Sequence, residues 1–299
     1  MIIKILKFRR FFQLLKLKGY SGFELSIKQT SKGFYFKKHT NTNTGRLLQQ
    51  SKKQQLYKKK LLKNPLHHIF DIPEIVNVEQ NDFLMEYVHG CSILDLIEYE
   101  QIDILKSLVD YLFDLIEWET SLCKNRKVPV YRFMDKLCKI PDVSNFKNIL
   151  KKKLVENNKS MIPIGFCHGD LTLSNIIYSK KIYLVDLHDP FIESPLQDIC
   201  KLFQEVDLKW SFLMSKKSVD KPKINIAYDF LCKRVYDKAE LFCRKYSINR
   251  EVLFLFHFMT LYRLFAYTKT KNMKNFVKKS CLRLLKDEEK FNSPYSWRE

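Results

Sequence analysis

The sequence lacks several features that would assign it to a common class. It has eight cysteines but no Cys-X-X-Cys pair, so neither a disulfide framework nor a zinc site is indicated. No run approaches the roughly 18 apolar residues of a membrane span. The amino-terminal segment is basic throughout and has no clean apolar core before a small-residue cleavage site, which excludes a typical signal peptide. We therefore expect a cytoplasmic globular protein with reduced cysteines.

Acidic residues are also scarce. Lysine and arginine number 53 against 33 acids, a net charge of +20, which raises the possibility of a nucleic-acid partner. The lysines lie in four separate segments, however, at Lys52–Lys63, Lys147–Lys153, Lys216–Lys223 and Lys269–Lys279. Solvated helix faces explain most of them. A nucleic-acid partner is thus not favoured, and non-enzymatic binding of nucleic acid remains an alternative.

Residues 1–18 are basic and carry aromatics, but their apolar positions nearly encircle a helix. Such a segment either packs on a small lobe or lies on an anionic membrane surface. The second alternative would place the protein peripherally at the inner face of the membrane.

The first third of the chain has the pattern of strands. Alternation predicts strands at Phe23–Gln29 and Phe34–Lys38, separated by a turn. A helix is predicted at Leu47–Leu62, followed by strands at 73–78 and from Phe83 into a connector that ends at Gly90.

Beyond this connector the chain is mainly helical. Strong 3–4 periodicity predicts a helix at 105–122, Ser92 can cap one at 93–99, and Pro195 opens one through about residue 206. Further helices are predicted at 224–246, 250–267 and 273–290. Strands first and helices later indicate an α+β fold with two lobes. We place the small, β-rich N-lobe at residues 1–86 and the larger C-lobe at 87–299.

One stretch in the second lobe carries chemistry. His168-Gly169-Asp170 is followed by Asn175, and two short strand-like runs, 176–179 and 182–187, lead to Asp186. If Lys180 and Lys181 form a two-residue turn, Asn175 lies directly opposite Asp186, although this dipeptide lacks the usual chemistry of tight hairpins. Amide and carboxylate oxygens held together suit Mg²⁺.

This set of residues suits phosphoryl transfer to a hydroxyl. The reaction needs a carboxylate to orient the attacking hydroxyl and accept its proton, and divalent cations to bridge the phosphates. Asp170 is the candidate base, Asn175 and Asp186 are candidate metal ligands, and His168 could brace the loop as a neutral imidazole.

The motif His168-Gly-Asp170-x₄-Asn175, with Leu184-Val-Asp186 after it, resembles the kinase-like phosphotransferases. These include aminoglycoside phosphotransferases, choline and ethanolamine kinases, and bacterial surface-glycan kinases such as Kdo kinases. Two further segments resemble the same family: the connector from Phe83 to Gly90, and Ser194-Pro195 with Asp198. The resemblance spans residues 19–206 and implies a protein-kinase-like fold.

The resemblance also implies the cofactors ATP and Mg²⁺ and assigns roles within the first lobe. Lys37 would contact the α- and β-phosphates, and Gly19 and Gly22 would cover the nucleotide. Met85 would occupy the gatekeeper position, with the backbone of Glu86 and Val88 meeting adenine.

The sequence departs from the family in the first lobe and after Asp186. The family's helix glutamate has no acidic counterpart, because Asp71 is the only acid between Glu24 and Glu74. Gln50 and Gln54 are the inward-facing substitutes. Leu187-His188 replaces the usual residues after the metal aspartate.

We therefore predict an ATP- and Mg²⁺-dependent kinase that phosphorylates a hydroxyl of a small molecule, a sugar or a cell-envelope glycan or glycolipid. The basic surface favours an anionic acceptor and a place in polysaccharide biosynthesis. A nucleotide-binding pseudokinase is the alternative within the same fold, and a metal-dependent phosphohydrolase fits the His-Gly-Asp triplet less well.

Overall fold

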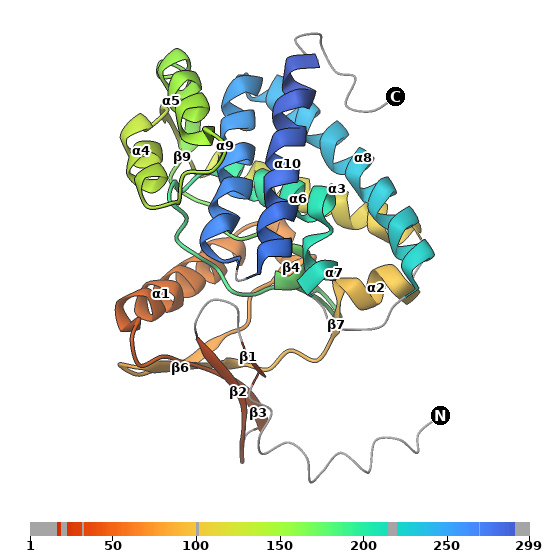
Figure 1. Cartoon of the computed structure of the whole chain (residues 1–299). Helices are drawn as coiled ribbons and strands as arrows, with labels where there is room; N and C mark the ends of the chain where they lie inside the picture. Colours follow the sequence, from red (N-terminus) through yellow and green to blue (C-terminus); the bar gives the residue numbers. More distant parts are fainter. Residues whose placement is uncertain are drawn as a thin grey trace. The chain divides into compact units, whose positions relative to one another are not determined.

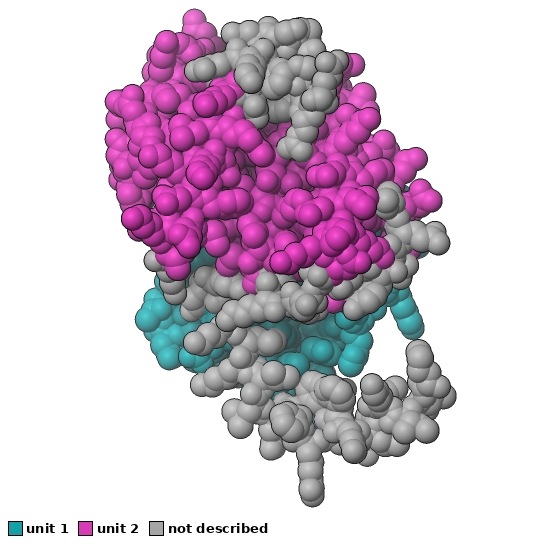
Figure 2. Space-filling model, turned by 45° about the vertical axis from the view of Figure 1, so that its right-hand side comes forward, with its two compact units in different colours: residues 1–92, 175–189 teal, residues 93–174, 190–299 magenta. Residues whose placement is uncertain are grey.

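The computed structural model describes residues 17–18, 23–31, 33–99, 102–214, 220–268 and 270–290. The described chain groups into two compact units, one of residues 1–92 with 175–189 and the other of 93–174 with 190–299 (Figure 2). The sequence predicts a division after residue 86, with the hairpin in the second lobe. In the structure the hairpin 175–189 groups with the first unit.

The first unit contains a five-stranded antiparallel sheet (Figure 1). Its order is β1 (Leu17–Lys18), β2 (Glu24–Thr30), β3 (Gly33–His39), β6 (Asp82–Glu86) and β5 (Ile75–Val78). The predicted strands at Phe23–Gln29 and Phe34–Lys38 correspond to β2 and β3. Alternation of apolar and polar residues marks β2, and the aromatic run Phe34–Phe36 after the turn marks β3.

Helix α1 (Thr44–Leu61) covers one face of this sheet. Leu47 of the helix is fully buried among Phe23, Phe83 and Met85, with Phe36 packed against the cluster. Because side chains alternate along a strand, α1 covers the face of β3 that carries Phe36 and Lys38.

The first unit also contains a four-stranded sheet that holds the hairpin. Its order is β4 (Phe70–Asp71), β11 (Ile182–Leu184), β10 (Ile176–Tyr178) and β7 (Cys91–Ser92). A 3-10 turn, Pro65–His68, precedes β4.

The predicted register of the hairpin is wrong by one residue. Ile176 pairs with Leu184 and Tyr178 with Ile182, so three residues, 179–181, form the connection. Asn175 consequently lies opposite Val185, whose N–H donates to the Asn175 carbonyl at 3.0 Å. The reason is local: Lys-Lys cannot readily adopt the left-handed conformations that a two-residue turn needs, and the longer connection avoids them.

The second unit is mainly helical (Figure 1). Its helices are α2 (Ile93–Tyr99), α3 (Ile102–Ser121), α4 (Val130–Cys138), α5 (Phe146–Glu156), α6 (Pro195–Leu208), α7 (Trp210–Met214), α8 (Lys221–Lys245), α9 (Arg250–Tyr262) and α10 (Lys271–Lys290). The paired strands β8 (Lys124–Lys127) and β9 (Met161–Ile164) complete it, with 3-10 turns at Leu173–Asn175 and Arg263–Ala266. The last of these turns ends the helix predicted to continue to residue 267.

Helix α6 is the central element of the second unit and packs against α3, α8 and α9. Ser194 caps its amino terminus by accepting a hydrogen bond from the Leu196 N–H, and Pro195 occupies the first helical position. Both residues favour the start of a helix. A serine side chain can accept a hydrogen bond from an amide of the first turn, and a proline at the first position removes no intrahelical hydrogen bond. The α6 side chains are mostly buried, so the helix is held rigidly.

Among the residues that the structure describes, no helix combines the length and the apolar character needed to cross a membrane. Five of the eight cysteines are buried in the core, namely Cys167, Cys200, Cys232, Cys243 and Cys281.

A side chain at Gly90 is expected to destabilise the first unit. A Cβ at this position would lie 2.4 Å from the Tyr178 carbonyl oxygen, where the strand that follows Gly90 pairs with β10. We expect Gly90→Ala to lower the free energy of unfolding by about 2 kcal/mol, because backbone must move to relieve the overlap. Urea titration measures the change. Gly45→Ala, in α1 with open space around it, is the matched control and should be neutral or stabilising by up to about 1 kcal/mol. Equal effects at the two positions would contradict the expectation.

Candidate active site

The candidate catalytic loop, residues 168–175, connects β9 to the hairpin. Gly169 has a φ of +92°, a conformation that favours glycine. The His168 side chain is fully buried, and its Nδ1 accepts a hydrogen bond from the Asp170 N–H at 3.3 Å. A nitrogen that accepts a hydrogen bond carries no proton, so this contact fits a neutral imidazole that braces the loop.

Asp198 of α6 holds the start of this loop. Its two carboxylate oxygens accept hydrogen bonds from the His168 N–H at 2.7 Å and the Gly169 N–H at 2.8 Å. Asp198 is completely buried. A buried carboxylate that receives two backbone donors is strongly anchored, so the loop conformation is tied to the first turn of α6.

Asp170 itself faces a lysine that the sequence analysis did not identify. The Lys201 Nζ lies 2.9 Å from Asp170 Oδ1, and both side chains are largely buried, with 15% and 25% of their surface exposed. Lys201 lies one helical turn beyond Asp198, and helical side chains three residues apart share a face. The three-residue spacing between Asp198 and Lys201 is the sequence signal that could have identified Lys201.

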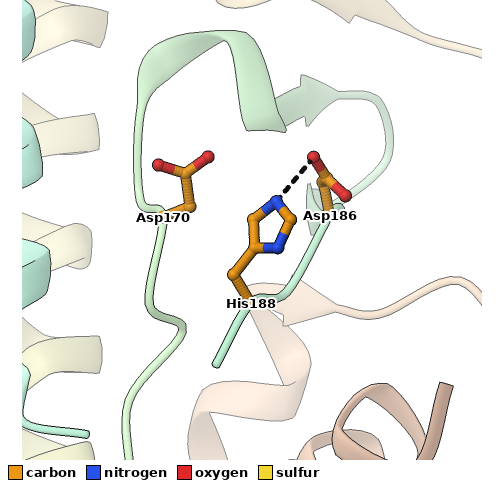
Figure 3. A group of neighbouring side chains, drawn as sticks. All are labelled: Asp170, Asp186 and His188. Carbon is orange, nitrogen blue, oxygen red and sulfur yellow. Dashed lines mark hydrogen bonds and ion pairs between the residues drawn. The ribbon is translucent and has the colours of Figure 1, made fainter. Parts of the chain in front are cut away.

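In the first unit, Asp186 follows β11 with a left-handed backbone, φ +59°. Its carboxylate pairs with the Lys38 ammonium and, at 3.1 Å, with His188 Nε2. Figure 3 shows the His188 ring directed at the Asp186 carboxylate. Burial alone would raise the pKa of Asp186, but the His188 ring and the Lys38 ammonium outweigh it and hold that pKa well below its usual range.

The structure distinguishes the two adjacent lysines of β3. Lys37 points to the sheet face opposite α1 and pairs with Asp82 at 2.7 Å, with 33% of its side chain exposed. Lys38 lies on the face that α1 covers, is 4% exposed and pairs with Asp186. The two lysines therefore have different partners on opposite faces of β3.

Gln50 and Gln54, the substitutes for the missing glutamate, have different partners. The Gln50 side-chain amide contacts His188 Nδ1, whereas Gln54 Nε2 donates to the Pro73 carbonyl at 2.8 Å. Lys53, between them, donates to the His188 carbonyl at 2.5 Å. Helix α1 therefore reaches the residues after β11 through His188, a role the sequence analysis did not assign.

The predicted hinge residues lie at the end of β6 and after it. Met85 is buried in the core of the first unit and contacts Gln54 Nε2 through its sulfur at 3.5 Å. The Glu86 N–H donates to the Glu74 carbonyl at 2.8 Å, and Val88 lies just beyond the strand.

Three further predicted site residues are Gly19, Gly22 and Asn175. The predicted phosphate-covering glycines, Gly19 and Gly22, lie outside the described residues. Asn175 ends the 3-10 turn Leu173–Asn175 and lies next to β10. It carries the carboxamide that was predicted to bind metal beside Asp186.

Fold and site together define a protein-kinase-like α+β protein, and comparison with solved structures confirms the fold. A glucosamine kinase matches over 89% of this chain and 80% of that chain, with a TM-score of 0.53 and 9% identity. A glucosamine kinase in complex with glucosamine, ADP and inorganic phosphate matches over 90% and 83%, with a TM-score of 0.50 and 10% identity. Likeness at such low identity establishes the fold alone. No protein-family model matches the sequence, and no curated protein matches it.

Asp186 is expected to stabilise the first unit in a pH-dependent way. Asp186→Asn removes the negative partner of buried Lys38, and we expect it to lower the free energy of unfolding at pH 7 by roughly 1–3 kcal/mol. Because the folded-state pKa of Asp186 is depressed, its contribution is present above the unfolded pKa of about 3.9 and is lost as pH falls. Urea unfolding from about pH 7 down to pH 2 should therefore show the two proteins converging. Asp189→Asn, whose side chain is 51% exposed, is the control and should change stability little. A difference that stays constant with pH would exclude this account.

Proposed function

We propose that the protein is an ATP- and Mg²⁺-dependent phosphotransferase that phosphorylates a hydroxyl group of a small molecule. One observation carries the proposal: the Asp170 loop is fixed by a buried carboxylate on α6, in a chain with the fold of a glucosamine kinase. A fixed loop of this kind suits phosphoryl transfer, in which positioning and electrostatics supply most of the catalysis.

Asp170 would act as the base, since its carboxylate can orient the acceptor hydroxyl and take its proton. Asn175 and Asp186 would hold Mg²⁺, because both offer the hard oxygen atoms that this ion prefers. The bound ion would supply positive charge to the phosphates. His168 braces the loop.

Nucleotide contacts would come from the first unit. We assign the phosphate contact to Lys38 in place of Lys37, because Lys38 is the lysine that pairs with Asp186. Met85 and the backbone of Glu86 and Val88 would meet adenine, and Gly19 with Gly22 would cover the phosphates.

For the acceptor we propose a sugar or amino sugar first, since one structural neighbour is a kinase in complex with glucosamine. Choline-like alcohols and cell-envelope glycans or glycolipids are the other acceptors to test. The net charge of +20 supports an anionic acceptor, and peripheral contact with the inner face of a membrane would suit a glycolipid. If charge reversal at Arg9 and Arg10 left vesicle binding and turnover unchanged, membrane contact would be excluded.

A nucleotide-binding pseudokinase is the second candidate. It is favoured by α1, which offers no acid to hold the strand lysine and instead contacts His188 through Gln50. Phosphate transfer from ATP, screened over glucosamine, other sugars, amino alcohols and envelope glycolipids, separates the two. Nucleotide binding without transfer to any acceptor would favour the pseudokinase.

The two central aspartates should have separable effects. With ATP and Mg²⁺ at about 100 times their dissociation constant, the wild-type protein should gain about 2.7 kcal/mol of stability. Asp186→Ala should abolish this gain because it removes a metal ligand, whereas Asp170→Ala should retain it and lower turnover by about 10²–10⁴-fold. Thermal unfolding with and without nucleotide, alongside a transfer assay, measures both. A gain that is retained in Asp186→Ala would refute the metal assignment.

The adjacent lysines offer a matched pair of variants. Lys38→Met should lower kcat/KM for ATP by about 10²-fold or more, since it removes a cation proposed to contact the phosphates. Lys37→Met removes a pair on the other face of β3 and should change kcat/KM less than about threefold while costing at most about 1 kcal/mol of stability. Steady-state kinetics with varied ATP decides between them, and the reverse order of effects would restore Lys37 as the phosphate-binding residue.

A further inference from the structure

One face of α6 follows the candidate catalytic loop along its length. Asp198, Lys201 and Glu205 are spaced i, i+3 and i+7, so they share a face and span about 10 Å of helix. Each of the three contacts a different part of the loop 168–174. Asp198 binds the first two backbone amides, and Lys201 pairs with Asp170.

Glu205 reaches the far end of the loop. Its carboxylate accepts a hydrogen bond from the Leu173 N–H at 3.3 Å and another from the Ser211 N–H at 2.7 Å. The Ser211 hydroxyl donates to Glu205 at 2.6 Å and accepts from the Ser174 N–H at 2.9 Å. Two consecutive loop amides, those of Leu173 and Ser174, therefore depend on Glu205 directly or through Ser211.

Glu205 is completely buried, and this burial raises the pKa of its carboxyl even though its hydrogen bonds lower it. Tyr228 of α8 adds a fourth donor at 2.8 Å. Four donors match the acceptor capacity of one carboxylate. Burying an acid is costly unless its hydrogen bonds are satisfied, so this network forms only when the loop end, α7 and α8 are correctly placed around it.

Between the two acids, Lys201 acts on the carboxylate of Asp170. Its Nζ also donates to Gln204 Oε1 at 3.1 Å, one helical turn along. With the ammonium anchored on a buried helix, Asp170 Oδ1 has a fixed partner. A carboxylate oriented in this way presents a defined direction to an acceptor hydroxyl, and small errors in such orientation cost large factors in rate.

We propose that α6 is the template of the catalytic loop, with Lys201 positioning the base Asp170 and Glu205, through Ser211, positioning the loop end that leads to Asn175. The role of Lys201 rests on the proposed phosphotransferase function, whereas the Glu205–Ser211 contact can be tested without it. Both are positioning residues.

The first experiment measures loop order without any substrate. In Ser211→Ala, the Ser174 amide loses its acceptor, and its hydrogen exchange should accelerate about tenfold or more. The amides of His168 and Gly169 should keep their protection. Tyr228→Phe, which removes a donor to Glu205 but none from the loop, is the control and should leave Ser174 unchanged. Two results would overturn the proposal that α6 positions the loop through Ser211. One is unaltered hydrogen exchange of the Ser174 amide in Ser211→Ala, and the other is equal acceleration of exchange along the whole loop.

The second experiment tests Lys201 through the separation of kcat from KM. With glucosamine or water as the phosphate acceptor, Lys201→Met should lower kcat by about 10–100-fold while KM for ATP stays within about twofold. Lys201→Arg should retain most of the activity, because it preserves the charge facing Asp170. Lys153→Met, which breaks another half-buried ion pair in the same unit, with Glu251 at 3.2 Å, should leave kcat unchanged.

The outcomes for Lys201 are separable from failure of the proposed function. If wild-type protein transfers phosphate and Lys201→Met does so at an equal rate, the positioning role is overturned. If the wild-type protein neither binds nucleotide nor transfers phosphate, the proposed function and the Lys201 role fail together. The exchange experiment then still decides whether α6 holds the loop.

Discussion

A largely buried ion pair links the two sheets of the first unit: the Lys38 ammonium pairs with the Asp186 carboxylate. A lysine with 4% exposure is costly to bury unless an opposite charge compensates it. The pair joins β3 of the five-stranded sheet to the residue that follows β11 of the other sheet. Asp186 makes this pair from a left-handed backbone, φ +59°.

In the second unit, buried carboxylates are likewise compensated by partners, here mainly backbone amides. Asp198 and Glu205 are both fully buried on α6. Asp198 accepts from two backbone amides of the loop, and Glu205 accepts from the Leu173 amide together with donors of Ser211 and Tyr228. An irregular loop in the interior would otherwise leave polar groups unpaired. The core of the unit thus specifies the loop, because α6 is itself fixed by packing against α3, α8 and α9.

Structural elements whose signal is carried by contiguous residues lie close to the positions that the sequence predicts. The segment from His168 to Asp186 and the periodic helices such as α6 and α9 lie close to their predicted positions, since the information is carried by neighbouring residues. The weaker predictions required knowledge of packing. Which of Lys37 and Lys38 pairs with Asp186 depends on the face of β3 that α1 covers. The hairpin register depends on a turn whose length Lys-Lys does not specify.

The roles of Lys201 and Glu205 also could not be predicted without knowing how the elements pack. Their spacing from Asp198 places them on one helix face, but nothing local indicates that the loop 168–174 runs along that face. The contact depends on how α6 is rotated about its own axis, which is set by the apolar residues it buries. A charged residue on a mostly buried helix is nevertheless a useful signal, because it must have a partner nearby.

Helix α1 contains no acidic residue, and the acids that pair with its lysines lie elsewhere in the first unit. Lys53 lies 3.6 Å from Asp189, and Lys58 lies 3.4 Å from Asp71. The partners of these lysines therefore come from the segment after β11 and from β4 instead of from α1. In this arrangement a glutamate on α1 is not required to balance Lys38, since Asp186 does so. Asp186 also contacts His188, which α1 contacts in turn through Gln50 and Lys53.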